Sequence, residues 1–150
     1  MEPRVYFEDA VVGQRRQFGS YTIAEDEILR FAREFDPQPF HVDKALAEKS
    51  VYGGLIASGW HTCAIAMRAI CDGFLSGAAA MGSPGVDEIR WRAPVRAGDR
   101  LTCYGTVLEA RPSRSKPDRG VIVTQTEMVN QRGEIVMTMR GMTLMRRRPA

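Results

Sequence analysis

The chain has 150 residues, of which 44% are hydrophobic and 26% charged, and its formal net charge is +3. This length suits one domain over residues 1–150 with a substantial core, and the proportions are ordinary for a globular protein. No apolar run reaches the roughly 20 residues that span a bilayer. The start, Met1–Arg4, lacks an apolar signal region, so we expect a cytoplasmic protein without a membrane partner.

The positive charge is concentrated in two places, Arg146–Arg148 and the segment 111–119. Neither is accompanied by an aromatic or zinc-type motif, so no nucleic acid partner is expected. Arg114 and Lys116 are candidates instead for the phosphates of a small ligand. The chain also has three widely spaced cysteines, which match no metal-ligand pattern and are expected to be reduced thiols: Cys63, Cys71 and Cys103.

The first part of the chain is predicted to form one strand followed by helices. Residues 14–23 are rich in β-formers, and Thr22–Glu25 resembles a capping box with Thr22 as the cap. Pro37 ends the helix that follows, and residues 43–49 indicate a further short helix. Apolar residues recur at helical spacing on one face of the first helix, which we expect to be buried: Ile28, Phe31, Ala32 and Phe35.

A long helix is predicted over residues 59–77, with Ser58 as its N-cap. It is apolar around most of its circumference, which is typical of a central, buried helix. Four segments rich in β-formers follow: residues 86–91, 100–110, 120–130 and 134–145. Helices followed by a run of strands predict an α+β fold, an antiparallel sheet that wraps around the long helix.

The run Asp36-Pro37-Gln38-Pro39-Phe40-His41 places a carboxylate and an imidazole five residues apart in a segment stiffened by two prolines. Acid/base chemistry at neutral pH favours histidine, often beside a carboxylate whose pKa a partly apolar site can raise. The alternative is a helix-ending loop in which Asp36 only caps backbone amides and His41 is exposed. The local sequence leaves both interpretations open.

The start of the long helix is the second candidate site. Its free backbone amides carry partial positive charge, and Gly59 lets a ligand oxygen approach them closely. A developing enolate oxygen at this point would be stabilised as in an oxyanion hole. The alternative is a simple capped helix start. His61, in the first turn, is predicted to be a core or interface histidine and ranks behind His41 as a catalyst.

At these residues the chain resembles the MaoC-like dehydratase family, the (R)-specific enoyl-CoA hydratases of hotdog fold. The hydratase motif of that family is Asp, a variable residue, usually Asn, then Pro, a hydrophobic residue and His, and it stands here as Asp36–His41. Ile56-Ala57-Ser58-Gly59 matches the Ile-Ala-His-Gly stretch that opens its central helix. Residues 86–91, 94–95 and 98–99 resemble its strand and turn signature, so the resemblance covers nearly the whole chain.

The resemblance implies a hydro-lyase that reversibly adds water to a trans-2-enoyl-CoA and gives the (R)-3-hydroxyacyl-CoA, without metal or other cofactor. Asp36 would accept the water proton, and His41 would orient the water and help to deliver a proton to the α-carbon. The amide of Gly59 would bind the thioester oxygen. Further substrate contacts are expected from six residues: Gln38, Phe40, Ser58, Trp60, Arg114 and Lys116.

The same resemblance implies an acyl-CoA or acyl-carrier-protein thioester as the bound partner, and a homodimer or higher assembly. Gln38 stands where the family usually has Asn, Ser58 replaces a His, and Met67 falls where several relatives carry a helix serine. Thioester hydrolysis is an alternative, since hotdog proteins also include thioesterases. A non-catalytic acyl-CoA-binding subunit is another, consistent with the missing serine hydroxyl.

Overall fold

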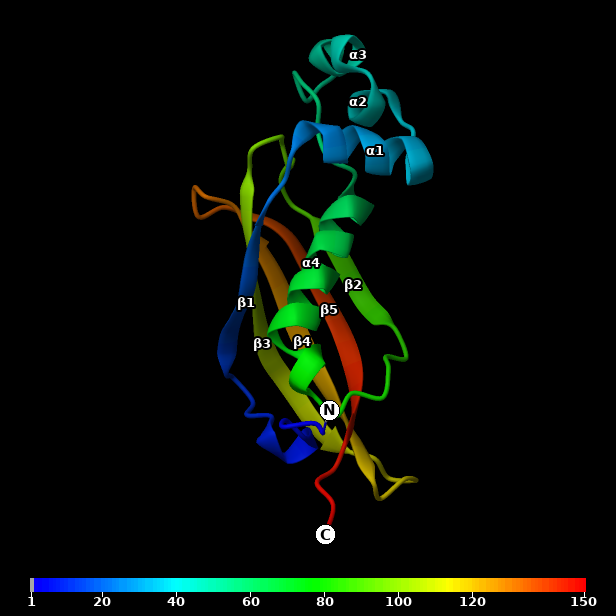
Figure 1. Cartoon of the computed structure of the whole chain (residues 1–150), viewed down its shortest axis with the longest axis vertical. Coiled ribbons are helices and arrows are strands. Elements are labelled where there is room, and N and C mark those ends of the chain that lie inside the picture. The colour runs from blue at the N-terminus through cyan, green and yellow to red at the C-terminus, as the bar shows by residue number, and fades with distance from the viewer. Residues whose placement is uncertain (1) are drawn as a thin grey trace.

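A computed structural model describes residues 2–150. Figure 1 shows a long sheet that curves along the helix α4, with three shorter helices beyond one end of the sheet and both ends of the chain near the other. In chain order the elements are η1 (Phe7–Asp9), β1 (Arg15–Thr22), α1 (Glu25–Phe35), α2 (Pro39–Val42), α3 (Lys44–Lys49), α4 (Gly59–Gly73), η2 (Leu75–Gly77), β2 (Val86–Trp91), β3 (Arg100–Pro112), β4 (Arg119–Val129) and β5 (Ile135–Arg146).

The five strands form one antiparallel sheet in the order β1-β3-β4-β5-β2. Burial alternates along β3 and β4, as expected when one face of a sheet packs on the core and the other does not. The sheet therefore has two edges, β1 and β2, and its buried face receives α4. This confirms the α+β fold with an antiparallel sheet around a long helix.

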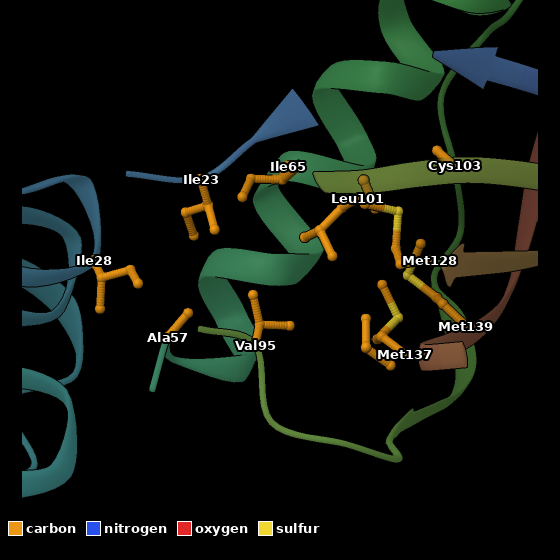
Figure 2. Packing of buried hydrophobic residues seen from close by; sticks show 12 residues of the cluster. Ile23, Ile28, Ala57, Ile65, Val95, Leu101, Cys103, Met128, Met137 and Met139 are labelled. Carbon is orange, nitrogen blue, oxygen red and sulfur yellow. The ribbon is translucent and has the colours of Figure 1, made fainter. Parts of the chain in front are cut away.

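The main core lies between α4 and the buried face of the sheet (Figure 2). Ile65 contributes from α4, Leu101 from β3 and Met128 from β4, while Ile23 and Ile28 extend the core toward α1. Four of these side chains, those of Ile23, Ile28, Leu101 and Met128, are completely buried. Removing a large aliphatic side chain of this kind from water contributes about 1.5–3 kcal/mol. The overhanging helix α1 is thus anchored to the same core as the sheet.

Two local expectations about α1 are wrong. The N-cap of α1 is Ala24, because Thr22 is still paired with Arg100 in the sheet and the chain turns only after it. Glu27 closes the first turn by accepting the backbone N–H of Ala24. Phe35 is 67% exposed, although its spacing placed it on the buried face. It lies in the last turn of α1, beyond the region that packs on the core.

The central helix is shorter and less buried than predicted. It ends at Gly73 and is followed by the 3₁₀ turn η2, so the helical run to residue 77 is interrupted. Gly73 lies directly against Phe18 of β1, where a side chain would collide with the strand. One face of α4 is open in the isolated chain: Met67 is 46% exposed and Trp60 is exposed as well. Within residues 2–150 no helix is both long and apolar enough to cross a bilayer.

Leu101→Ala tests whether the core carries the stability of the fold. Leu101 is 0% exposed, so its truncation should lower the free energy of unfolding by about 2–5 kcal/mol. The matched control is Leu46→Ala on α3, where the same side chain is 49% exposed and the change should stay within about 0.5 kcal/mol. Urea unfolding followed by circular dichroism measures both, and equal losses would contradict this description of the core.

Candidate active site

The segment from Asp36 to His41 turns back on itself. Asp36 follows α1 directly, and its backbone N–H still bonds to the Ala32 carbonyl. Pro39 then begins the one-turn helix α2, at a position where the missing N–H of proline costs no hydrogen bond. His41 lies on this helix and not in an extended loop, so its ring returns toward the Asp36 carboxylate.

His41 is held by hydrogen bonding and burial. Its ring is 4% exposed, and Nδ1 lies 2.7 Å from the carbonyl oxygen of Ile56. A carbonyl only accepts, so Nδ1 is the donor in this bond, and the other ring nitrogen, Nε2, faces Asp36. Nε2 lies 3.3 Å from Oδ2 of Asp36. His41 is therefore not the exposed residue that the helix-ending interpretation requires.

The Asp36 carboxylate accepts hydrogen bonds from two side chains. Gln38 donates its amide to Oδ1 and Ser58 donates its hydroxyl to Oδ2, both at 2.7 Å. Partial burial raises the pKa of Asp36, but these two bonds and the neighbouring His41 together lower the pKa below its ordinary value. The expectation that the site raises the pKa of this carboxylate is wrong, because donors outweigh desolvation. Asp36 is thus ionised at neutral pH and able to accept a proton.

Ser58 connects this carboxylate to α4. It is completely buried, and its hydroxyl oxygen accepts the backbone N–H of Trp60 at 3.3 Å while donating to Asp36. The predicted N-cap is therefore confirmed. The predicted substrate contact is not seen, because the hydroxyl is engaged on both sides and Ser58 does not line the pocket. The cap could be predicted from the position of Ser58 before the helix. The bond to Asp36 could not, because Asp36 approaches Ser58 only in the tertiary structure.

Gly59 begins α4, so its N–H belongs to the first turn and has no carbonyl partner within the helix. The indole of Trp91, from the end of β2, lies so close that a side chain at position 59 would collide with it. Trp60 packs edge-on against the same indole, with ring centroids 5.1 Å apart. Only glycine fits at position 59, and the indoles of Trp60 and Trp91 lie beside the helix start.

These groups surround one pocket of about 430 Å³. It is lined by six of the nine sequence-predicted residues: Asp36, Gln38, Phe40, His41, Gly59 and Trp60. Tyr52, Trp91 and Arg92 also line it and were not predicted. Trp91 and Arg92 lie where β2 ends, and their approach depends on how that strand packs against α4. The sequence signal for this side of the pocket was a tryptophan at the end of a predicted strand.

Arg114 and Lys116 are not brought to this pocket within the chain. They lie in the exposed turn between β3 and β4. The site end of β3 is near Leu101, and the 13 residues of this strand lead away from it at about 3.3 Å per residue. Figure 1 shows the turn at the end of the sheet opposite to α1, α2 and α3.

His61 has a different environment from His41. It is buried beside α1, and its ring stacks on Phe31 with centroids 4.5 Å apart. Burial lowers the pKa of His61; Glu27 opposes this shift and Arg30 adds to it. Nδ1 has no hydrogen-bond partner among the described residues. His61 is not among the residues that line the pocket. Among residues 2–150, no group of three His, Cys, Asp or Glu side chains is placed to hold a metal ion.

Known proteins resemble this chain in sequence and in fold. The family model described as "MaoC like domain" matches residues 8–131. The chain belongs to this family. It is 32% identical over 116 residues to an (R)-specific enoyl-CoA hydratase of Rhodospirillum rubrum, covering 73% of this chain and 74% of that protein. It is also 32% identical over 126 residues to the uncharacterized protein YdeM of Bacillus subtilis, covering 83% and 87%.

A solved structure supports the fold of this MaoC-like chain. The crystal structure of a MaoC-like dehydratase from Rhodospirillum rubrum superposes with a TM-score of 0.87 at 41% identity, covering 97% of this chain and 99% of that one. The MaoC-like chain therefore has the hotdog fold of its family, in which a sheet wraps a central helix. The family includes hydro-lyases, and one of them is the R. rubrum relative named above.

Ser58→Ala tests whether the hydroxyl keeps Asp36 acidic. Loss of this donor should raise the pKa of Asp36, because one of the two side-chain bonds that stabilise the carboxylate disappears. Carbon-13 NMR titration of the Asp36 carboxyl carbon measures the shift. The control is Ser50→Ala, since the Ser50 hydroxyl bonds only to backbone groups of residues 47 and 52.

The lowered pKa of Asp36 also makes the stability of the fold depend on pH. Asp36 has a folded pKa below its ordinary value, so its contribution to stability is present above the unfolded pKa and is lost as the pH falls through the folded pKa. Ser58→Ala should reduce this pH dependence. An unchanged Asp36 pKa in the Ser58 variant would contradict the role given to the hydroxyl.

Proposed function

We propose that the chain, acting as one domain over residues 1–150, is an enoyl-CoA hydratase that reversibly adds water to a trans-2-enoyl thioester. One observation carries this proposal. The Asp36 carboxylate and Nε2 of His41, a ring held through Nδ1 by a carbonyl, lie 3.3 Å apart, and both residues line the same pocket as Gly59, whose N–H starts α4 without a partner in the helix. The R. rubrum relative of that activity supports it.

The proposed reaction gives a role to each of these groups. Water bound between the Asp36 carboxylate and Nε2 of His41 attacks the β-carbon and forms the C–O bond, while Asp36 accepts one water proton. The π electrons of the double bond move to the thioester oxygen, and the N–H of Gly59 stabilises the resulting enolate. The enolate then takes this proton from Asp36 at its α-carbon with the help of His41, so that the thioester carbonyl re-forms and the Asp36 carboxylate is regenerated. Water is added in full, and no electron donor or acceptor is needed.

The pocket walls suit this chemistry. His41 is positioned by the Ile56 carbonyl and Asp36 by Ser58 and Gln38, so little reorganisation is required when the water binds. Trp60 and Trp91 provide apolar surface beside the Gly59 amide, which strengthens its hydrogen bond to a charged oxygen. Arg92 is the cationic side chain of this pocket and replaces Arg114 and Lys116 as our candidate for contact with a phosphate.

Asp36→Asn and His41→Gln should each lower the rate of crotonyl-CoA hydration by about 100-fold or more, the usual scale for an acid/base group. Loss of the enoyl absorbance follows the reaction. Asp72→Asn is the control, because Asp72 is an exposed carboxylate paired with Arg68 on α4 and remote from the pocket lining. Turnover that survives both Asp36→Asn and His41→Gln would exclude the proposal.

Measuring free CoA thiol in the same reaction separates hydration from thioester hydrolysis. A hydratase keeps the thioester bond, so no free CoA thiol should appear while the double bond is consumed. Release of thiol at the rate of substrate loss would show that the carboxylate directs water to the carbonyl carbon instead of the β-carbon. Binding of acyl-CoA without turnover of any enoyl-CoA would favour a non-catalytic subunit.

We also propose that the chain forms a homodimer through β2. This strand is a sheet edge with one row of backbone groups free to pair with another strand. Large apolar side chains are exposed on and beside it: Val86, Trp91, Trp60 and Met67. The opposite edge, β1, begins instead with the charged or polar residues Arg15, Arg16 and Gln17. A two-fold pairing of β2 with its copy would cover the apolar side chains.

Light scattering coupled to size-exclusion chromatography tests the dimer. The expected mass is twice the 16.7 kDa of one chain. A mass of one chain at micromolar concentration would contradict the dimer. The hydratase proposal does not depend on this result, because its assay measures turnover.

A further inference from the structure

Residues 50–54, which we name the Tyr52 loop, follow α3 on the way to α4. Figure 1 shows α3 beyond the end of the sheet, with the chain returning from it to the start of α4. Tyr52 is half-buried and lines the pocket of the candidate active site. Val51 beside it is 96% exposed, so the loop borders the pocket on one side and solvent on the other.

The ring of Tyr52 supports the pocket wall beside His41. It lies edge-on to the ring of Phe40, with centroids 5.3 Å apart, and Phe40 lies edge-on to His41 at 4.6 Å. Both Phe40 and Tyr52 line the pocket. Edge-to-face pairs of aromatic rings are favourable contacts. If Tyr52 left this position, one side of Phe40 would lose its partner and the pocket would open to water next to His41.

The Tyr52 loop is held to the neighbouring turn by one side chain, that of Arg96. Its Nη2 donates to the backbone carbonyl oxygen of Tyr52 at 2.6 Å. The guanidinium lies along the loop backbone, since a Cβ at Gly54 would be only 3.2 Å from Nη1. Arg96 belongs to the turn between β2 and β3, so this bond joins two segments that are far apart in the sequence.

The other hydrogen bonds of the loop are internal to it or reach the end of α3. The backbone N–H groups of Tyr52 and Gly53 donate to Ser50, and Ser50 donates to the Ala47 carbonyl. Gly53 has a φ of +65°, which glycine adopts without strain in such a turn. Within residues 2–150, the bond from Arg96 is therefore the hydrogen bond that ties this loop to the turn after β2.

The turn that carries Arg96 is itself fixed to the site. Asp99 is 5% exposed; its Oδ2 accepts the backbone N–H of Arg96 and its Oδ1 accepts the side-chain amide of Gln131, both at 2.9 Å. The Val95 carbonyl accepts the N–H of Ala57, in the segment before α4, at 2.8 Å. The backbone of Arg96 thus has a set position, and the end of its side chain passes this position on to the Tyr52 loop.

We propose that Tyr52 contacts the bound thioester as part of the pocket wall, and that Arg96 is a positioning residue that holds the Tyr52 loop closed. This inference rests on the proposed function for the identity of the ligand. Arg96 acts on the substrate only through Tyr52. The free protein then has a closed loop that binds the thioester and an open loop that does not, and affinity falls with the fraction of chains that are open.

Arg96→Met should raise the dissociation constant of butanoyl-CoA about tenfold, because the bond that favours the closed loop is lost. Isothermal titration calorimetry measures this constant, and butanoyl-CoA has no double bond to hydrate. Arg96→Lys keeps a cationic donor and should recover part of the affinity. Arg100→Met is the matched control, since Arg100 is also exposed, uses its backbone N–H to bond Gln131 and does not line the pocket. It should leave the constant unchanged.

A double-mutant cycle tests whether Arg96 acts through Tyr52. Tyr52→Ala should also weaken butanoyl-CoA binding about tenfold, whereas Tyr52→Phe keeps the ring and should bind as the wild type does. Arg96→Met should add nothing in the Tyr52→Ala background, because the position of the loop no longer matters once the ring is gone. Additive effects of the two substitutions, or unchanged affinity in either single variant, would overturn the inference.

Two further measurements separate positioning from a general loss of structure. In Arg96→Met, hydrogen exchange followed by mass spectrometry should show faster exchange in residues 50–54 and unchanged exchange in α4. In the crotonyl-CoA assay, KM should rise about tenfold with kcat unchanged, because bound substrate restores the closed loop. A lower kcat with unchanged KM, as partial unfolding would give, would overturn the inference.

Failure of this inference is distinguishable from failure of the proposed function. Wild-type hydration of crotonyl-CoA, with KM and butanoyl-CoA affinity unaffected by Arg96→Met, overturns only the role of Arg96. The expected changes in butanoyl-CoA affinity without turnover of any enoyl-CoA overturn only the hydratase proposal. If the wild type does not bind butanoyl-CoA, the role given to Tyr52 is wrong.

Discussion

The site depends on the two hydrogen bonds of one buried hydroxyl. Ser58 caps α4 through the N–H of Trp60 and donates to Asp36, so the helix start and the carboxylate are held in a fixed relation. The bond from Nδ1 of His41 to the Ile56 carbonyl adds the imidazole to the same unit. Because Ile56 and Ser58 are two residues apart, one short segment before α4 positions acid/base groups that come from a different part of the chain. The fold brings these segments together by burying Ile28 of α1 with Ile65 of α4.

The sequence was sufficient for the elements whose signals are local. The strands of the second half, the proline that ends α1 and the serine cap of α4 follow from propensity and capping chemistry, and the structure has them with small changes of boundary. The motif from Asp36 to His41 gave the candidate pair, but not its geometry. The orientation of the His41 ring and the lowered pKa of Asp36 depend on the Ile56 carbonyl and the Ser58 hydroxyl, which approach only after folding.

The errors in the sequence-based predictions also arise from contacts that form only in the tertiary structure. Phe35 has the spacing of a core residue, yet α1 overhangs the sheet, so Phe35 contacts the ring of Phe31 in its own helix but stays 67% exposed. Arg114 and Lys116 have the right chemistry for a phosphate, but strand β3 carries them to the far end of the sheet. Trp91 carries no motif, and its importance follows from packing, because its indole covers Gly59. Local sequence patterns do not predict such a contact.

The contact between Gly59 and Trp91 links the chemistry of the site to the alignment of an edge strand. Trp91 is aligned with Met137 of β5 at the end of a ladder that already contains one irregularity, between Val86 and Glu88. In a β-strand, a slip of one residue turns every side chain to the opposite face of the sheet. A slip in β2 would therefore turn the indole away from the helix start and admit bulk water beside the Gly59 amide. Faithful strand alignment is thus a condition for the proposed oxyanion site, although no residue of β2 takes part in the proton transfers that we propose.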